Sequence, residues 1–210
     1  MTSQDLPHLV DRWAEGFARS RQVGYARYGD VIEVDVEGGG RRLELVLVEP
    51  DRDLLGTTAA RVAGTHDVWL TAFSAGPWGH DTPEGLRTVL DGEVLMTRSL
   101  ESQSPGGAVE LEVHGQRLYG VVRDGDVVAA GGWVAAVGEH AVFDRVETHP
   151  DYRRRGLASQ VMRALETWAV EQGAPRGILA ASVEGQALYA HLGWQVAARM
   201  TTLGGAPAPG

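Results

Sequence analysis

The sequence contains no cysteine, which excludes disulfide bonds, thiolate metal ligands and a cysteine nucleophile. It also lacks any run of about eighteen apolar residues, the length that a helix needs to cross a membrane. The first residues, MTSQDLPHLVDRW, lack the basic stretch followed by an apolar run that is typical of a secretory signal. We therefore expect a cytoplasmic protein with no membrane segment and no metal site.

Basic residues are scarce relative to acidic ones. There are 19 Lys and Arg against 28 Asp and Glu, which gives a formal net charge of −9. This balance disfavours nucleic acid as a partner, because binding to the phosphate backbone depends on basic side chains. An acidic surface would attract a cationic amine, although solubility alone explains the same charge. The composition, 43% hydrophobic over 210 residues, is typical of one large globular domain or two small ones.

The most informative stretch is 142–170, which predicts a strand, a basic glycine turn and an amphipathic helix ended by Gly173 and Pro175. The first amides of a helix have no acceptor within it, and the helix dipole is positive at that end. The turn at 153–159, RRRGLAS, adds three arginines and a glycine that lets the backbone approach an anion closely. The alternative is an ordinary surface helix, but arginines at this end oppose the dipole. The pattern favours a phosphate-binding site at the start of the helix.

This stretch resembles the GNAT superfamily of acetyl-CoA-dependent N-acyltransferases. The family signature is Arg or Gln, two residues, Gly, one residue, and Gly or Ala, and it is matched by Arg153, Gly156 and Ala158. A second family segment, LYxxLGF, is similar to Leu188–Trp194 (LYAHLGW), and the matched region covers about 121–203. The resemblance implies an α/β (α+β) GNAT fold, with a mixed central sheet flanked by helices. It also implies transfer of an acetyl group from acetyl-CoA to an amine.

The resemblance further implies where acetyl-CoA binds. Its pantetheine arm would pair with the main chain at 146–148, as an added strand does, and its pyrophosphate would lie on the amides of the turn. Many relatives carry an asparagine seven residues before a tyrosine; here Ser182 takes that place, and its hydroxyl can make one of the same bonds. The implied cofactor-binding residues are Val146, Thr148, Arg153, Arg154, Arg155, Gly156, Leu157, Ala158, Ser159 and Ser182.

GNAT enzymes use direct attack of the amine on the thioester, and two proton transfers then need side chains. Tyr189 occupies the tyrosine position of the family and would protonate the leaving thiolate. Glu147 is the first choice as base, acting directly or through water; alternatively it pairs with a neighbouring arginine such as Arg145. Other candidate bases are Asp144, His140 and Glu184, whereas His149 is expected to belong to the turn.

A repeat links the two halves of the chain. Pro50 precedes Gly56 by the same distance that Pro150 precedes Gly156, an offset of one hundred residues (150 − 50), and a strand–helix–strand order surrounds both sites. At the position of the signature arginine, the first copy has Asp53, which would repel a pyrophosphate.

The repeat predicts two GNAT-like halves in tandem. We expect 1–103 to be a degenerate half without a cofactor site, and 104–210 to be the catalytic domain with a disordered tail from about 204. The alternative is that the first half is an unrelated α+β cap. The first helix is predicted over 3–19 with Ser3 as its cap, and 74–91 is predicted to be a loop over the active site.

The sequence contains no motif that marks the acceptor pocket. A small molecule is favoured over a protein as the acceptor. Two exposed aromatic residues of the predicted loop, Trp78 and His80, are candidate contacts to this substrate. A homodimer is possible. The alternative function is a non-catalytic module that binds or senses acyl-CoA with a GNAT fold.

Overall fold

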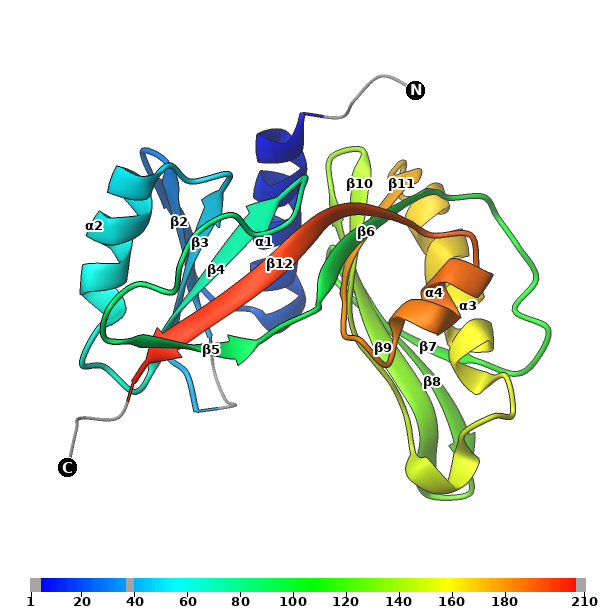
Figure 1. The fold of residues 1–210 in the computed structure, drawn as a ribbon. Coiled ribbons are helices and arrows are strands. Elements are labelled where there is room, and N and C mark those ends of the chain that lie inside the picture. The colour runs from blue at the N-terminus through cyan, green and yellow to red at the C-terminus, as the bar shows by residue number, and fades with distance from the viewer. Residues whose placement is uncertain (1–4, 37–39, 207–210) are drawn as a thin grey trace.

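The computed structural model describes residues 5–36 and 40–206, whose strands form one mixed sheet flanked by helices (Figure 1). The order of paired strands in these residues is β1-β2-β3-β4-β12-β6-β11-β10-β9-β8-β7, and β5 pairs with β12. This arrangement confirms the predicted α/β class. The strands are β1 (Tyr25–Tyr28), β2 (Val31–Asp35), β3 (Leu43–Val48), β4 (Val68–Ser74), β5 (Leu86–Leu90), β6 (Val94–Ser99), β7 (Glu110–His114), β8 (Arg117–Asp124), β9 (Val127–Val137), β10 (His140–Thr148), β11 (Arg176–Ala181) and β12 (Gln195–Gly205). The helices are α1 (Leu6–Arg21), α2 (Arg52–Val62), α3 (Leu157–Glu171) and α4 (Gln186–His191), with the short 3₁₀ helix η1 (Pro150–Tyr152).

The two halves of the chain repeat one unit. In the first half, β1, β2 and β3 pair antiparallel, and β3 continues through α2 to the parallel strand β4. In the second half, β8, β9 and β10 pair antiparallel, and β10 continues through α3 to the parallel strand β11. The strand–helix–strand repeat inferred from the offset of one hundred residues is therefore present in the topology.

The halves exchange their last strands. The strand β6 of the first half lies between β11 and β12 of the second, antiparallel to both. In return, β12 runs back to pair with β4 and β5 (Figure 1). Each half therefore depends on a strand of the other to complete its part of the sheet. The division near residue 103 stays a prediction, and pairing across it joins the halves through the centre of the sheet.

Helix α1 belongs to the first half in sequence but packs on strands of both halves. Its buried residues Trp13 and Phe17 join a core cluster that includes Phe73 from β4 and Val142 from β10. A Cβ atom on Gly16 would lie 2.2 Å from Cγ2 of Val142, so only glycine allows this approach of helix to strand. The apolar face of α1 therefore forms a wall against which the two halves meet.

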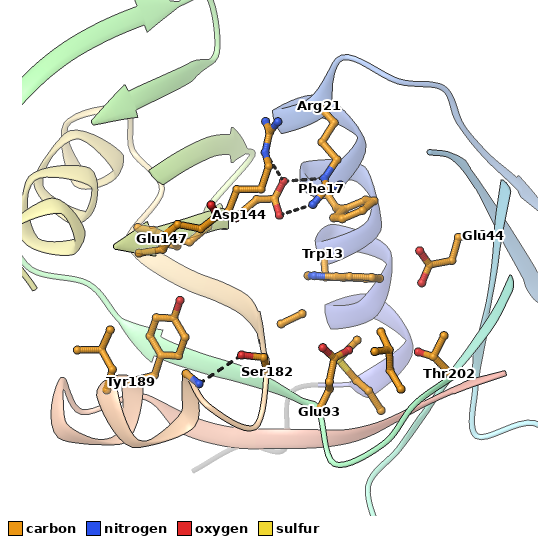
Figure 2. Close-up of a pocket in the computed structure, with 18 of the residues that line it drawn as sticks. Trp13, Phe17, Arg21, Glu44, Glu93, Asp144, Glu147, Ser182, Tyr189 and Thr202 are labelled. Atoms are coloured by element: carbon orange, nitrogen blue, oxygen red, sulfur yellow. Dashed lines mark hydrogen bonds and ion pairs between the residues drawn. The ribbon is translucent and has the colours of Figure 1, made fainter. Parts of the chain in front are cut away.

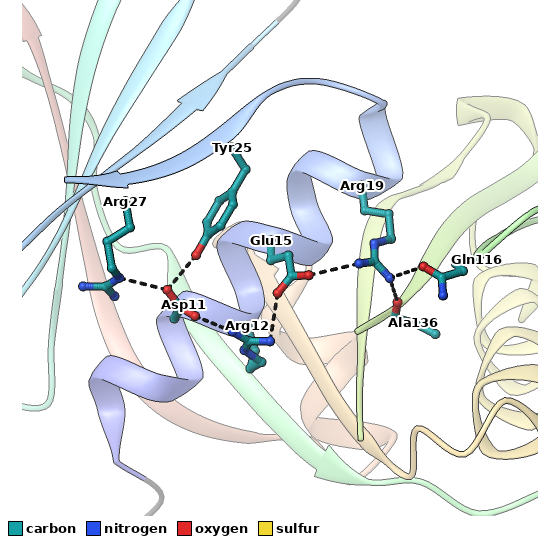
Figure 3. A network of polar contacts seen from close by, with 8 residues as sticks. All are labelled: Asp11, Arg12, Glu15, Arg19, Tyr25, Arg27, Gln116 and Ala136. Carbon is teal, nitrogen blue, oxygen red and sulfur yellow. Dashed lines mark hydrogen bonds and ion pairs between the residues drawn. The ribbon is translucent and has the colours of Figure 1, made fainter. Parts of the chain in front are cut away.

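A network of polar contacts connects α1 to neighbouring elements of both halves (Figure 3). At one end Asp11 accepts a hydrogen bond of 2.6 Å from the Tyr25 hydroxyl of β1. At the other end Arg19 donates to Oε1 of Gln116 and to the carbonyl oxygen of Ala136. Since such partly exposed pairs contribute only about 0–1 kcal/mol each, their main effect is to orient α1. The full network consists of Asp11, Arg12, Glu15, Arg19, Tyr25, Arg27, Gln116 and Ala136.

Helix α1 begins and ends later than the predicted 3–19. It begins at Leu6 with Pro7 in its first turn, where the missing N–H of proline has no cost, and no side chain caps it. Ser3, the predicted cap, lies outside the described residues. The helix continues to Arg21 and ends where Gln22 adopts a left-handed conformation. Within residues 5–36 and 40–206, no helix combines the length and apolar character needed to span a bilayer.

Two segments predicted to be irregular contain strand. The segment 74–91, predicted to be a loop, includes β5. The prediction of a disordered tail from about 204 is wrong for Gly204 and Gly205, which are the last residues of β12. A Cβ atom on Gly205 would lie 2.1 Å from the carbonyl oxygen of Thr65, so the close packing of this strand end requires glycine. The glycines at this end resemble a linker in the sequence, but they are required here for close packing. Residues 207–210 lie outside the described residues.

Candidate active site

The parallel strands β10 and β11 separate partway along their length. They pair from His140 to Phe143 on β10, whereas β10 itself continues to Thr148. The β9–β10 pairing is interrupted by a bulge between Asp144 and Glu147, where Arg145 has a φ of 51°. A positive φ at a non-glycine residue is uncommon and is found at functional sites. Beyond the bulge, the edge of 146–148 that faces away from β9 has no strand partner in the described residues, as the predicted pairing with a pantetheine arm requires.

The basic turn leads into α3 as the sequence predicts. Gly156 is the N-cap residue with φ 75° and ψ 9°, and no side chain caps the helix. Arg155 bonds the carbonyl oxygen of Asp151 at 2.9 Å and stacks on Tyr152, whereas Arg153 is exposed and has no ion pair in the described residues. The first amides of α3, from Leu157 to Ser159, are therefore available to an anion, with basic side chains beside them.

A cavity of about 420 Å³ lies where the two halves meet (Figure 2). Of the predicted site residues, Val146, Glu147, Ser182 and Tyr189 line this cavity. Thr148 and the turn at 153–159 do not line it. The structure thus brings both predicted catalytic residues together, and it leaves the predicted phosphate site outside the cavity at the start of α3.

Tyr189 is held on α4 with its side chain almost completely buried, and its hydroxyl is directed into the cavity (Figure 2). Burial and the nearby charge of Asp144 raise the pKa of Tyr189 to about 12. The phenol therefore stays protonated at neutral pH and can donate a hydrogen bond. The hydroxyl of Ser182, nearby on the loop after β11, accepts a bond of 3.3 Å from the amide of Gly185 at the start of α4.

Glu147 is exposed to the cavity and has no ion pair in the described residues. The alternative partner, Arg145, instead contacts Asp144 at 3.3 Å and donates to the carbonyl oxygen of Ser20. The carboxylate of Glu147 is therefore left free to accept a proton.

The other candidate bases are less suitable. Asp144 lines the cavity, but Arg21 binds both of its carboxylate oxygens at 2.8 and 2.9 Å, so its charge is already compensated. His140 is buried at the opposite end of β10, and burial together with His8 lowers the pKa of His140 to about 4. Glu184 is exposed and lies outside the cavity lining.

Two further expectations concern the loops. His149 belongs to the turn, as predicted: its Nδ1 accepts a hydrogen bond from the Asp151 amide. Trp78 and His80 do not line the cavity; their rings contact each other with centroids 4.9 Å apart, and Trp78 packs against the core below α2. These two residues are therefore structural here and not part of the cavity wall.

Several cavity residues come from the first half and were missed. Trp13 and Phe17 belong to the buried core of α1 and also form part of the cavity wall. Glu44 gave a signal that could have been used, because it interrupts the apolar run LELVLV of β3. Glu93 gave none, because it lies in an ordinary polar turn before β6.

Comparisons with known proteins agree with this fold. Residues 89–194, about half of the chain, match the acetyltransferase (GNAT) family. No curated protein sequence matches the chain significantly. Among solved structures, a GCN5-related N-acetyltransferase from Kribbella flavida is 17% identical, with a TM-score of 0.67 over 96% of each chain. A GNAT-family protein from Novosphingobium aromaticivorans DSM 12444 is also 17% identical, with a TM-score of 0.65 over 97% of this chain and 100% of that one.

One further solved structure shares the arrangement of two units. It is a tandem GNAT protein from the clavulanic acid biosynthesis pathway, 12% identical to this chain, with a TM-score of 0.50. The alignment covers 100% of this chain and 98% of that protein. At this identity the similarity concerns the fold alone, and it extends over both halves.

Proposed function

We propose, because this chain belongs to the GNAT family of acetyltransferases, that it transfers the acetyl group of acetyl-CoA to the amine of a small molecule. The observation that carries this proposal is the cavity beside the separated ends of β10 and β11, which Glu147 and Tyr189 both line. A volume of about 420 Å³ is typical of sites for small molecules.

One molecule of acetyl-CoA is proposed to contact two parts of the second half. The pantetheine arm pairs with the open main-chain edge at 146–148, and the hydroxyl of Ser182 supplies a further polar contact. The pyrophosphate lies on the first amides of α3, assisted by Arg153 and Arg154. The positive φ of Gly156 and the uncapped helix start support this assignment.

The first half is proposed to bind no acetyl-CoA. The equivalent helix α2 has Asp51 as its N-cap, and that carboxylate accepts a hydrogen bond of 2.8 Å from the amide of Leu54. Asp53 adds a second negative charge in the first turn. An anion would be repelled from this helix start, whereas the start of α3 has neither feature.

The proposed reaction is a direct displacement. Glu147, directly or through water, takes a proton from the acceptor ammonium. The free amine nitrogen then attacks the acetyl carbonyl carbon; the N–C bond forms, the C–S bond breaks, and the nitrogen releases its second proton to solvent. Tyr189 gives its hydroxyl proton to the departing thiolate and regains one from solvent, so the products are the acetamide, CoA thiol and one proton.

The strength of Tyr189 as an acid limits how it acts. Its raised pKa makes the phenol a weaker acid than an exposed tyrosine, but it keeps the proton in place over the whole physiological range. Its hydrogen bond therefore strengthens as negative charge develops on sulfur, and the proton is transferred only after this charge has formed.

The cofactor site is tested by the double substitution Arg153→Asp/Gly156→Asp. It replaces an attractive charge by two repulsive ones at the start of α3, and we expect acetyl-CoA affinity to fall about 100-fold or more, which corresponds to about 3 kcal/mol. The measurement is calorimetric titration of acetyl-CoA into wild-type and variant protein, after a melting curve has shown that the variant is folded.

The repeat supplies a matched control. Gly56→Asp introduces the same residue one hundred positions earlier in the sequence, inside α2, where a Cβ atom has no neighbour within 4 Å. Acetyl-CoA affinity should be unchanged in this variant. Equal losses in both variants, or no binding by folded wild-type protein, would contradict the proposal.

A further inference from the structure

The cavity has two chemically different ends. Figure 2 shows Glu147 and Tyr189 on one side, Glu44 and Glu93 on the other, and Trp13 from α1 between them. The first side carries the groups assigned to acetyl transfer. The second side is built by the first half and by β12, and the proposed chemistry leaves it without a role.

The arginines of the cavity wall already pair with carboxylates of the protein. Arg21 binds Asp144 through two nitrogens. Arg145 contacts the same carboxylate. Arg41 contacts Glu44 at 3.0 Å and lies over the ring of Trp69. Each arginine of the cavity wall in the described residues therefore already contacts a carboxylate of the protein.

Two carboxylates of the wall, in contrast, have no ion pair in the described parts of the chain: Glu147 and Glu93. Glu147 faces the reacting amine. Glu93 lies at the other end, on the turn before β6, where its carbonyl oxygen accepts a hydrogen bond of 3.0 Å from the amide of Met200. This bond fixes the backbone of Glu93, and the residue lines the cavity.

The neighbour of Glu93 makes a cation still more favourable there. Glu44 is 3% exposed; its Oε1 accepts a 2.6 Å hydrogen bond from Thr71, and its Oε2 has no hydrogen bond, only the ionic contact with Arg41. Burial and the charge of Glu44 raise the pKa of Glu93, with Arg41 acting in the opposite direction. Two carboxylates near a single arginine carry an excess negative charge, which a bound cation would neutralise.

We propose that the acceptor is an amine whose far end carries a second cationic group, with an apolar linker along Trp13 and Phe17 and the second cation bound by Glu93. The inference rests on the proposed acetyl transfer, because it uses the position of Glu147 and Tyr189 to decide which end of the acceptor reacts. The chemical class is a diamine or an amine with a terminal guanidinium, of a length that spans the cavity.

The test compares α,ω-diaminoalkanes of three to eight carbons with 1-aminoalkanes of the same lengths. Binding is measured by calorimetry in the presence of CoA, which requires no turnover, and kcat/KM is then measured with acetyl-CoA. In wild-type protein we expect the best diamine to exceed its monoamine by about 10- to 100-fold in both quantities, the range of a charge-assisted hydrogen bond.

The decisive variant is Glu93→Gln, which keeps the shape of the side chain and removes its charge. It should abolish the preference for the diamine, mainly by raising KM for the diamine. Glu101→Gln, an exposed carboxylate outside the cavity lining, makes the same change in net charge and should keep the preference.

The outcomes separate the two proposals. Diamine binding that depends on Glu93, without acetylation of any amine, supports the second-cation site and contradicts the proposed function. Acetylation without a diamine preference, a preference that survives Glu93→Gln, or equal or undetectable binding of all diamines overturns the inference.

Discussion

Replacing Tyr189 by phenylalanine is expected to lower kcat by about 10²- to 10³-fold while leaving acetyl-CoA affinity nearly unchanged. The hydroxyl is directed into the cavity and makes no hydrogen bond to another side chain in the described residues, so its removal disturbs no structural contact. What is lost is a donor to the thiolate, and the loss of one preorganised donor to a developing anion has about this cost. The measurement is steady-state release of CoA thiol, with acetyl-CoA binding followed separately by calorimetry.

Tyr25 offers the matched control. It is also a tyrosine whose pKa is raised to about 12, by burial and by its hydrogen bond to Asp11, but it lies outside the cavity lining. Tyr25→Phe should leave kcat unchanged and lower stability by about 1 kcal/mol, because it removes a hydrogen bond. The opposite pattern, with kcat lost in Tyr25→Phe and retained in Tyr189→Phe, would exclude the assigned role.

The pH profile gives a further check on the protonation state of Tyr189. Since its pKa is raised to about 12, the phenol holds its proton throughout the range from pH 6 to about 10, and its deprotonation should produce no alkaline loss of kcat there. An alkaline loss of kcat below about pH 10 that disappears in Tyr189→Phe would contradict this assignment.

The parts of the site that could be predicted are those encoded by short, contiguous sequence. The turn at 153–159 joins a strand to a helix, and its chemistry depends on local residues alone. The same holds for Glu147 and Tyr189, which are placed by β10 and by the helix after β11. The resemblance of these short segments to the GNAT family therefore indicated two residues that line one wall of the cavity.

The opposite wall could not be predicted, because it is assembled by long-range pairing. Glu44 and Glu93 reach the cavity only because β12 crosses to β4 and β6 inserts beside β11. The ends of the two halves are similar in sequence, with Met96–Thr97 in β6 and Met200–Thr201 in β12, so local patterns cannot decide which strand completes which half. The repeat predicted two similar units, and the exchange between them became visible only in the strand register.

This exchange is the basis of the second large effect: Arg98→Ala is expected to destabilise the fold by about 3–5 kcal/mol. Arg98 lies on the exchanged strand β6, and its Nη1 contacts both carboxylate oxygens of Glu166 on α3, at 3.0 and 3.1 Å. Glu166 is 0% exposed, and burial raises its pKa although the charge of Arg98 lowers it. Removing the arginine leaves a buried carboxylate without its ion-pair partner, although Gln103 still donates a hydrogen bond of 3.2 Å to it and the charge of Arg163 lies farther away.

The measurement is urea or thermal unfolding near pH 8, where a loss of this size lowers the melting temperature by about 10 °C for a chain of this length. Arg176→Ala provides the control, since that arginine is largely exposed and 3.7 Å from Glu139. It should cost about 0–1 kcal/mol. Similar losses in the two variants would show that the pair between β6 and α3 has no special contribution to stability.

The sign of the pH dependence identifies the buried charge as the cause. In Arg98→Ala the lowering effect of the arginine on Glu166 is gone, so the pKa of Glu166 in the folded state rises further above its value in the unfolded chain. The folded state then binds more protons than the unfolded state, and stability increases as pH falls from the folded towards the unfolded pKa. The deficit of Arg98→Ala relative to wild type should therefore shrink between pH 8 and pH 5.

The double variant Arg98→Met/Glu166→Leu, which removes both charges, should lose less stability than Arg98→Ala and should show no such recovery, because a hydrophobic pair needs no counter-charge in this position. A deficit that is constant with pH would mean that lost packing of the long arginine side chain, and not the unpaired carboxylate, destabilises the exchanged strand.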